Sequence, residues 1–177
     1  MRKIKKILKN KRGESTPMTI AVVLAILLFA TVSWEFFRLG IVVQGVRDAL
    51  QSSVISVATT NYDETYNALR EGYSGGYKLS GNSWQTNLDY YDVYSRMDDI
   101  LGTHTSGGYH IKEQPNGYEY RFNNLDIDIE NTGLRNTSKE FEADVSVDIE
   151  VPLSFGWDML PPLTMEIRTK AAYMPKF

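Results

Sequence analysis

Few side chains in this sequence of 177 residues could do acid–base, nucleophilic or metal chemistry. Its only histidines are His104 and His110, and no carboxylate stands at a recognisable ligand spacing from them, so we interpret the Gly/Ser/Thr-rich stretch beside them as a loop and not as a metal site. Cysteine is absent, which excludes disulfides, thiol nucleophiles and Cys-ligated metals. No serine lies in a nucleophile-elbow pattern, and no phosphate-binding glycine loop is present. The sequence therefore predicts a protein that is not an enzyme and carries no cofactor.

A row of acidic residues is the one unusual feature among the charged side chains. In two segments the acids alternate with apolar residues, so on β-strands they would share one face of a sheet. Strand alternation alone produces such rows, and we interpret this one as a solvated face. Calcium binding is the alternative, because hard cations prefer clustered carboxylates. The row consists of Asp126, Asp128, Glu130, Glu142, Asp144, Asp148 and Glu150.

Charge is distributed very unevenly along the chain. The first twelve residues contain seven Lys and Arg and no acid, whereas the rest of the chain contains twelve Lys and Arg against 22 Asp and Glu. A basic arm of this kind suits nucleic acid or a membrane surface. An apolar run follows within a few residues, so we predict a membrane-flanking arm and no nucleic-acid partner.

The apolar run predicts one transmembrane helix. Residues 15–34 contain no formal charge, and twenty helical residues span about 30 Å, the thickness of the hydrocarbon layer. Pro17 falls in the first turn, where proline is tolerated. Trp34, Phe36 and Phe37 resemble an interfacial aromatic belt. The basic tail predicts a cytoplasmic N-terminus and an extracytoplasmic C-terminal part.

Two other interpretations of the apolar run stay open. A buried core helix of this length would be unusual in so short a chain. A cleaved secretory signal is the stronger alternative, because Thr31 and Ser33 are small residues at positions −3 and −1 of a cut before Trp34.

The helical pattern continues past the apolar run with one apolar stripe. Its residues recur at steps of three and four, which predicts a single helix from about Thr16 to about Ala58. Residues 59–61 predict an interruption, and a capping box of Asn61 and Glu64 would open a short helix that reaches Arg70. A third helix is predicted from Ser83 or Asn87 to Leu101. The stripe consists of Leu39, Val42, Val46, Leu50, Val54 and Val57.

The C-terminal half alternates in the manner of β-strands. Residues 109–113 and 118–122 flank a Pro-Asn-Gly turn and predict a hairpin, followed by a bulge at Asn123-Asn124. Residues 141–151 and 163–173 alternate apolar and polar side chains most regularly. We therefore predict an α+β fold in which the long helix packs on a four- to five-stranded, mostly antiparallel sheet. The predicted parts are a basic cytoplasmic leader (1–13), a transmembrane helix (14–37), an amphipathic extension (38–58) and an extracytoplasmic α+β domain (59–177).

These features resemble a known family. The basic start, the tripeptide Lys11-Arg12-Gly13 and the long apolar helix resemble the N-terminus of type IV pilin-like precursors. More narrowly, the Glu-Phe-x-Arg motif of Glu35, Phe36 and Arg38, with the helix that follows it, resembles TadE-like pseudopilins, minor components of the tight-adherence (Flp) pilus machinery. The resemblance covers residues 11–58.

The resemblance implies a structural role at the cell surface. A prepilin peptidase would cut after Gly13 and leave Glu14 as the new N-terminus. The helix would stay in the bilayer or pack laterally with other pilin-like subunits or assembly proteins. The chain departs from the family in having Met18 where a glutamate usually stands five residues after the glycine. A membrane-anchored binding module outside any pilus, and a secreted protein with a cleaved signal, are the alternative functions.

Overall fold

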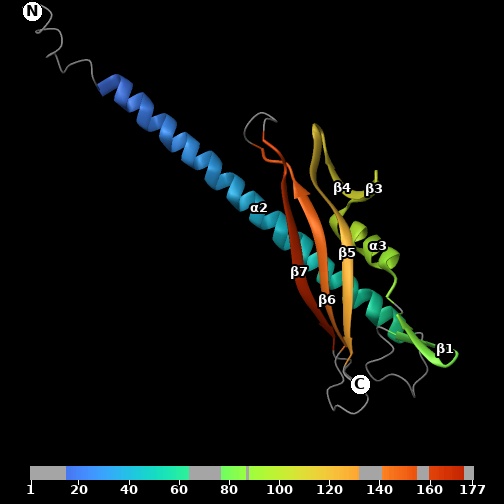
Figure 1. Ribbon diagram of the computed structural model, residues 1–177. Helices are drawn as coiled ribbons and strands as arrows, with labels where there is room; N and C mark the ends of the chain where they lie inside the picture. Colours follow the sequence, from blue (N-terminus) through green and yellow to red (C-terminus); the bar gives the residue numbers. More distant parts are fainter. Residues whose placement is uncertain (1–14, 64–76, 87, 132–140, 155–159, 174–177) are drawn as a thin grey trace, which may run out of the picture. The chain divides into compact units, whose positions relative to one another are not determined.

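The computed structural model describes residues 15–63, 77–86, 88–131, 141–154 and 160–173 (Figure 1). Contacts divide the chain into two compact units, Met1–Leu39 and Gly40–Phe177. The elements of the described residues, in chain order, are α2 (Ser15–Asp63), β1 (Tyr77–Ser80), β2 (Ser83–Thr86), α3 (Tyr90–Leu101), β3 (His104–Ser106), β4 (Tyr109–Gln114), β5 (Gly117–Asn131), β6 (Phe141–Val151) and β7 (Leu163–Tyr173).

One continuous helix, α2, carries both the apolar run and the apolar stripe. It begins one residue before the predicted helix and ends five residues after it, and it passes without a break through Thr59-Thr60-Asn61, so the predicted interruption is wrong. The two threonine hydroxyls donate to the carbonyls of Ile55 and Ser56, at 2.7 and 3.0 Å, so both side chains find their hydrogen-bond partners within the helix. The predicted helix up to Arg70 falls mostly on residues outside the described ranges.

Five strands form one antiparallel sheet in the order β3-β4-β5-β6-β7, so each strand pairs with its neighbour in sequence. Along β6 the side chains alternate strictly, with Phe141, Ala143, Val145, Val147, Ile149 and Val151 all buried. The predicted α+β fold and hairpin of β4 and β5 are confirmed. β1 and β2 form a separate two-stranded sheet.

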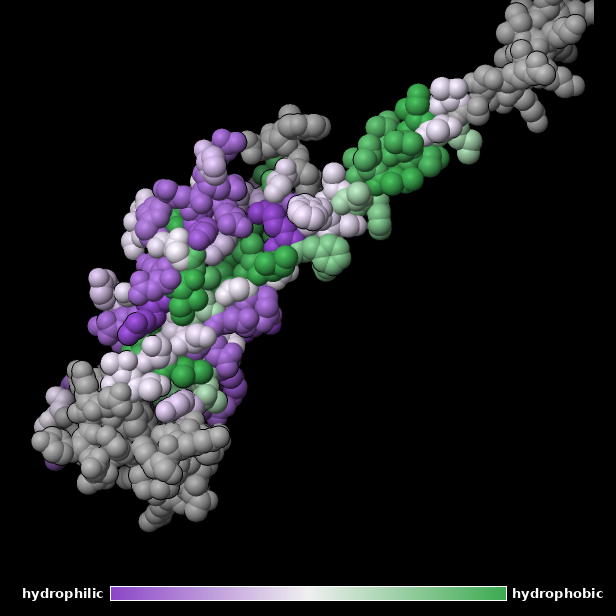
Figure 2. Space-filling model, turned by 180° about the vertical axis from the view of Figure 1, so that it is seen from behind, coloured by the Kyte–Doolittle hydropathy of each residue, from purple (hydrophilic) through white to green (hydrophobic). Residues whose placement is uncertain are grey.

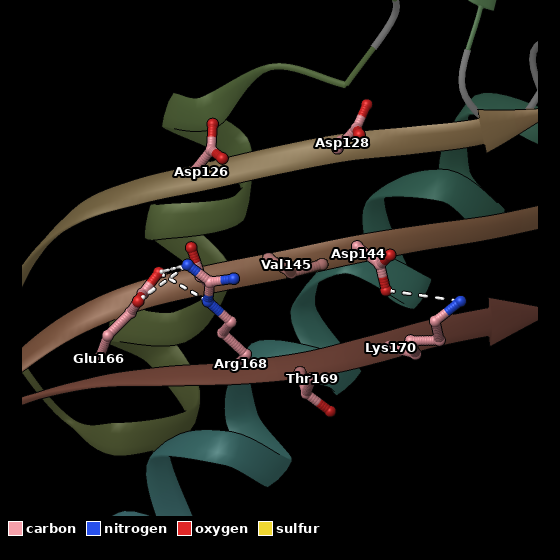
Figure 3. A pocket seen from close by; sticks show the side chains of 9 residues that line it. Asp126, Asp128, Asp144, Val145, Glu166, Arg168, Thr169 and Lys170 are labelled. Atoms are coloured by element: carbon pink, nitrogen blue, oxygen red, sulfur yellow. Dashed lines mark hydrogen bonds and ion pairs between the residues drawn. The ribbon is translucent and has the colours of Figure 1, made fainter.

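The core of the second unit lies between the sheet and the helices. The part of α2 after Gly40 buries Val46, Leu50 and Val54 completely, and α3 buries Val93 and Met97. Both helices lie behind the same face of the sheet, opposite the polar face (Figure 3). The predicted packing of the helix stripe on the apolar face of the sheet is therefore confirmed.

Two predicted assignments are corrected. Ser83 belongs to β2, and α3 begins at Tyr90, three residues after the alternative start at Asn87; the Asp89 side chain accepts a hydrogen bond of 2.9 Å from the Tyr91 N–H. His104 lies on β3 and not in a loop, whereas His110 lies on β4, within the strand predicted over residues 109–113. The sequence did not predict β3, because a strand of three residues beside two glycines is too short to show an alternation of apolar and polar side chains.

A bulge interrupts the pairing of β5 with β6 between Asn123 and Asp126, as the sequence predicted. Asn124 adopts a positive φ of 53°, a conformation that asparagine tolerates better than most residues. Its side-chain amide donates to Asp148 at 2.9 Å. The N–H of Leu125 donates to the Tyr94 hydroxyl at 2.8 Å, so α3 binds the backbone at the bulge.

Candidate functional site

The first half of α2 is apolar on all sides and exposed. Its most apolar 18-residue window has a mean hydropathy of 2.3, and only 6% of that window is buried. Leu28 and Phe29 are exposed by 67% and 76%, and Figure 2 shows apolar side chains gathered around this half of the helix. Among the described residues this is the one helix long and apolar enough to cross a membrane. A signal sequence near the N-terminus has the same length and apolar character.

The Glu-Phe-x-Arg motif places an ion pair at the end of the apolar run. Arg38 donates to Glu35 Oε1 at 2.7 Å, one helical turn away. Glu35 is buried, with 4% of its surface exposed, whereas Phe36 is 73% exposed. A buried carboxylate requires a positively charged partner, because removing an unpaired charge from water costs free energy. Gly13 and Glu14 lie outside the described residues.

The acidic row lies on the polar face of the sheet, where it is interspersed with bases from β7. A groove of about 580 Å³ is lined by Asp126, Asp128, Asp144, Glu166, Arg168 and Lys170, among others. Lys170 Nζ lies 3.0 Å from Glu142. Figure 3 shows two further ion pairs, that of Lys170 with Asp144 at 3.7 Å and that of Arg168 with Glu166 at 2.9 Å. In the described part of the chain no three His, Asp or Glu side chains are placed to hold one metal ion. The side chain of Glu130 is not among those described.

Glu150 belongs to a separate cluster at one end of the acidic row. It accepts hydrogen bonds from Arg121 at 2.8 Å and from Tyr118 at 2.6 Å, while the Arg121 guanidinium stacks 4.2 Å from the Tyr109 ring. Burial opposes ionisation of Glu150, but the hydrogen bonds from Tyr118 and Arg121 and the positive charge of Arg121 together outweigh it and lower the pKa of the Glu150 carboxyl group. Burial and the bond to Glu150 raise the pKa of Tyr118 to about 12. The cluster therefore links β5 to β6 through an ion pair and hydrogen bonds between their side chains.

The second polar cluster, which the sequence did not reveal, joins α3 to β4. His110 Nδ1 lies 2.8 Å from Asp98 Oδ2, and the Asp98 carboxylate also accepts a hydrogen bond from the Thr103 hydroxyl. The His110 ring stacks on Tyr94 at 4.1 Å and on Phe122 at 5.3 Å. The sequence did contain one indication of this cluster, because Tyr94 and Asp98 are four residues apart and therefore lie on the same face of α3. These contacts join α3 to β4 and help to fix the position of α3 on the sheet.

Comparison of the chain with protein-family models, with curated proteins and with solved structures gives no match. The architecture is pilin-like. A long N-terminal helix, apolar in its first half, packs through its second half on an antiparallel sheet.

Proposed function

We propose that this protein is a TadE-like pseudopilin, a structural, membrane-anchored subunit of a surface pilus or secretion apparatus. The observation that carries the proposal is the unbroken α2 helix, with its exposed apolar first half and its sheet-packed second half. The motif of Glu35, Phe36 and Arg38 supports the narrower assignment to TadE-like proteins.

The anchor follows from the energetics of the exposed apolar surface. Moving one large aliphatic side chain out of water stabilises the chain by about 1.5–3 kcal/mol, and the first half of α2 exposes many of them. The seven basic residues that precede the helix favour a cytoplasmic N-terminus. The chain therefore crosses the membrane once, with its α+β domain on the extracytoplasmic side.

The ion pair of Glu35 and Arg38 suits the membrane boundary. It follows the charge-free stretch directly, and the pairing offsets the cost of burying the Glu35 carboxylate. The neighbouring Phe36 stays exposed and is suited to the headgroup region. The same helix offers its apolar surface to neighbouring pilin-like subunits when it leaves the lipid.

Continuity of α2 also favours an anchor over a secretory signal. A cut after Ser33 would sever the helix in its middle, 30 residues before its end at Asp63. A prepilin-type cut after Gly13 would instead leave the helix whole, because α2 begins at Ser15.

Processing by a prepilin peptidase tests the proposal. The chain is co-expressed with such a peptidase, and membranes are analysed by intact mass. We expect wild type and Gly40→Ala to lose the first thirteen residues, since a methyl group at Gly40 meets open space. Gly13→Val should keep its full mass. Full-length wild type in the presence of an active peptidase would contradict the pseudopilin assignment.

A further inference from the structure

The edge of the sheet formed by β7 is eleven residues long and is not paired with any other strand of the described residues. β7 pairs with β6 through eleven residues in continuous register, from Leu163 to Tyr173. β7 ends the strand order, and within the described ranges no strand pairs with its outer side. In an antiparallel strand alternate residues direct their N–H and C=O groups outward, so about half of these residues present both groups to a new neighbour.

Of the sequence features that usually prevent edge pairing, β7 has only charged side chains, and these lie on its polar face. Proline, glycine and bulges are absent between Leu163 and Tyr173, and the residues on its inner face, Met165, Ile167, Thr169 and Ala171, are uncharged. The opposite edge differs, because β3 has only three residues and is followed by Gly107 and Gly108 in left-handed conformations. Within the described residues the two edges therefore differ, because β3 offers three residues for pairing and β7 offers eleven.

We propose that β7 binds an extended segment of another protein, which joins the sheet as an additional antiparallel strand. Backbone hydrogen bonds along β7 would hold the segment, and alternate side chains would select it. The proposal concerns the partner of the outer domain and goes beyond the pseudopilin assignment.

The two faces of β7 define the chemistry of the segment. On the inner face Met165 is half-buried and Ile167 buried, so the segment needs apolar side chains at every second position. On the polar face β7 presents Glu166, Arg168 and Lys170, a net charge of one positive. Acidic residues opposite Arg168 and Lys170 would form cross-strand pairs. β6 shows the same chemistry on the other side, where Asp144 lies opposite Lys170.

A second copy of the chain is a poorer match for the edge. Its β7 would bring two bases and one acid to the polar face, whereas an acidic segment can pair with both Arg168 and Lys170.

The test uses a synthetic fluorescein-labelled peptide with the sequence of residues 141–151. This sequence already pairs with β7 in a known register and has the required alternation of apolar and acidic residues. Binding to the full chain in detergent micelles is measured by fluorescence anisotropy. A peptide of the same composition with its alternation scrambled serves as the peptide control.

Two substitutions add the same charge to opposite faces of the edge. Met165→Lys points a charge inward and should weaken binding at least tenfold, whereas Thr164→Lys on the exposed face should change it less than twofold. Thermal unfolding verifies that both variants fold, and Thr169→Lys replaces Met165→Lys if the latter does not. When the peptide is bound, hydrogen exchange should slow at alternate backbone amides of β7 and stay unchanged at the amides of β6.

Several results would overturn the proposal. They are no saturable binding to wild type, equal binding of the scrambled peptide, or equal effects of the two lysine substitutions. Faster exchange in β6 would show strand replacement in place of addition. A wild-type dimer that Met165→Lys dissociates, detected by light scattering, would assign the edge to a second copy. None of these outcomes depends on processing at Gly13, so the two proposals fail separately.

Discussion

Asp98 connects α3 to β4 through a single carboxylate. It lies opposite His110 Nδ1, accepts from Thr103, and sits one turn before Gly102, whose N–H donates to the Asp98 carbonyl at 2.7 Å. Replacing it by asparagine removes the charge and one acceptor oxygen while keeping the shape of the side chain.

We therefore expect Asp98→Asn to lower the free energy of unfolding by about 1–3 kcal/mol. The exposed neighbour Asp99 provides the matched control, and Asp99→Asn should change stability by less than about 0.5 kcal/mol. Chemical denaturation in micelles measures both. Equal effects of the two substitutions would show that the cluster does not stabilise the fold.

Glu150 predicts a pH dependence with a definite sign. Its carboxyl pKa is lower in the folded chain than in the unfolded one, so the folded state binds protons less readily. The stabilisation is complete above about pH 5 and is lost as the pH falls through the lowered pKa. Thermal midpoints should fall on acidification, and less so in Glu150→Gln. Identical acid profiles for the two proteins would contradict this account of Glu150.

The candidate site could be predicted from the sequence only in part. Alternation placed the acids on one face, because a strand has a period of two. The partners of those acids were not predictable, since pairing such as that of Glu150 with Arg121 depends on strand register. Likewise, the contact between Asp98 and His110 arises from the way α3 crosses the sheet, which neither segment specifies alone.

At the scale of elements, the second half of α2 should dominate stability. Leu50 is completely buried against the sheet side of the helix, whereas Ile41 on the same helix is 74% exposed. Leu50→Ala should cost about 2–5 kcal/mol through lost burial and the cavity left behind. Ile41→Ala should cost less than about 0.5 kcal/mol. Urea denaturation measures the free energy of unfolding of both variants. Equal losses for Leu50→Ala and Ile41→Ala would contradict the packing of α2 on the sheet.

Long periodic elements were predictable and short ones were not. The alternation of β6 and β7 and the stripe of α2 each extend over eleven or more residues, enough to fix their type and buried face. β1, β2 and β3 have three or four residues each, too few for periodicity to show. The threonines at 59 and 60 suggested a break, but their hydroxyls bond to carbonyls of the preceding turn.

At the scale of the whole molecule, the exposed apolar half of α2 should hold the protein in the bilayer. Leu27 lies in the middle of this half and is 56% exposed. Leu27→Arg should cost about 2.5–3.5 kcal/mol of insertion free energy and increase the fraction released by alkaline carbonate. Ile41→Arg, beyond the apolar run, should stay in the membrane pellet. Equal release of both variants would contradict a span centred near Leu27.

The N-terminal residue of the mature protein, determined together with its mass from purified native membranes, tests the central claim most directly. The account predicts a chain that begins at Glu14 and stays in the membrane fraction, with α2 whole. A chain that begins at Trp34 and is recovered in the soluble fraction would contradict it, because the anchor would then be a removed signal. A membrane-bound chain that keeps its basic leader would contradict prepilin-type processing and leave a single-pass anchor without a pilin's maturation.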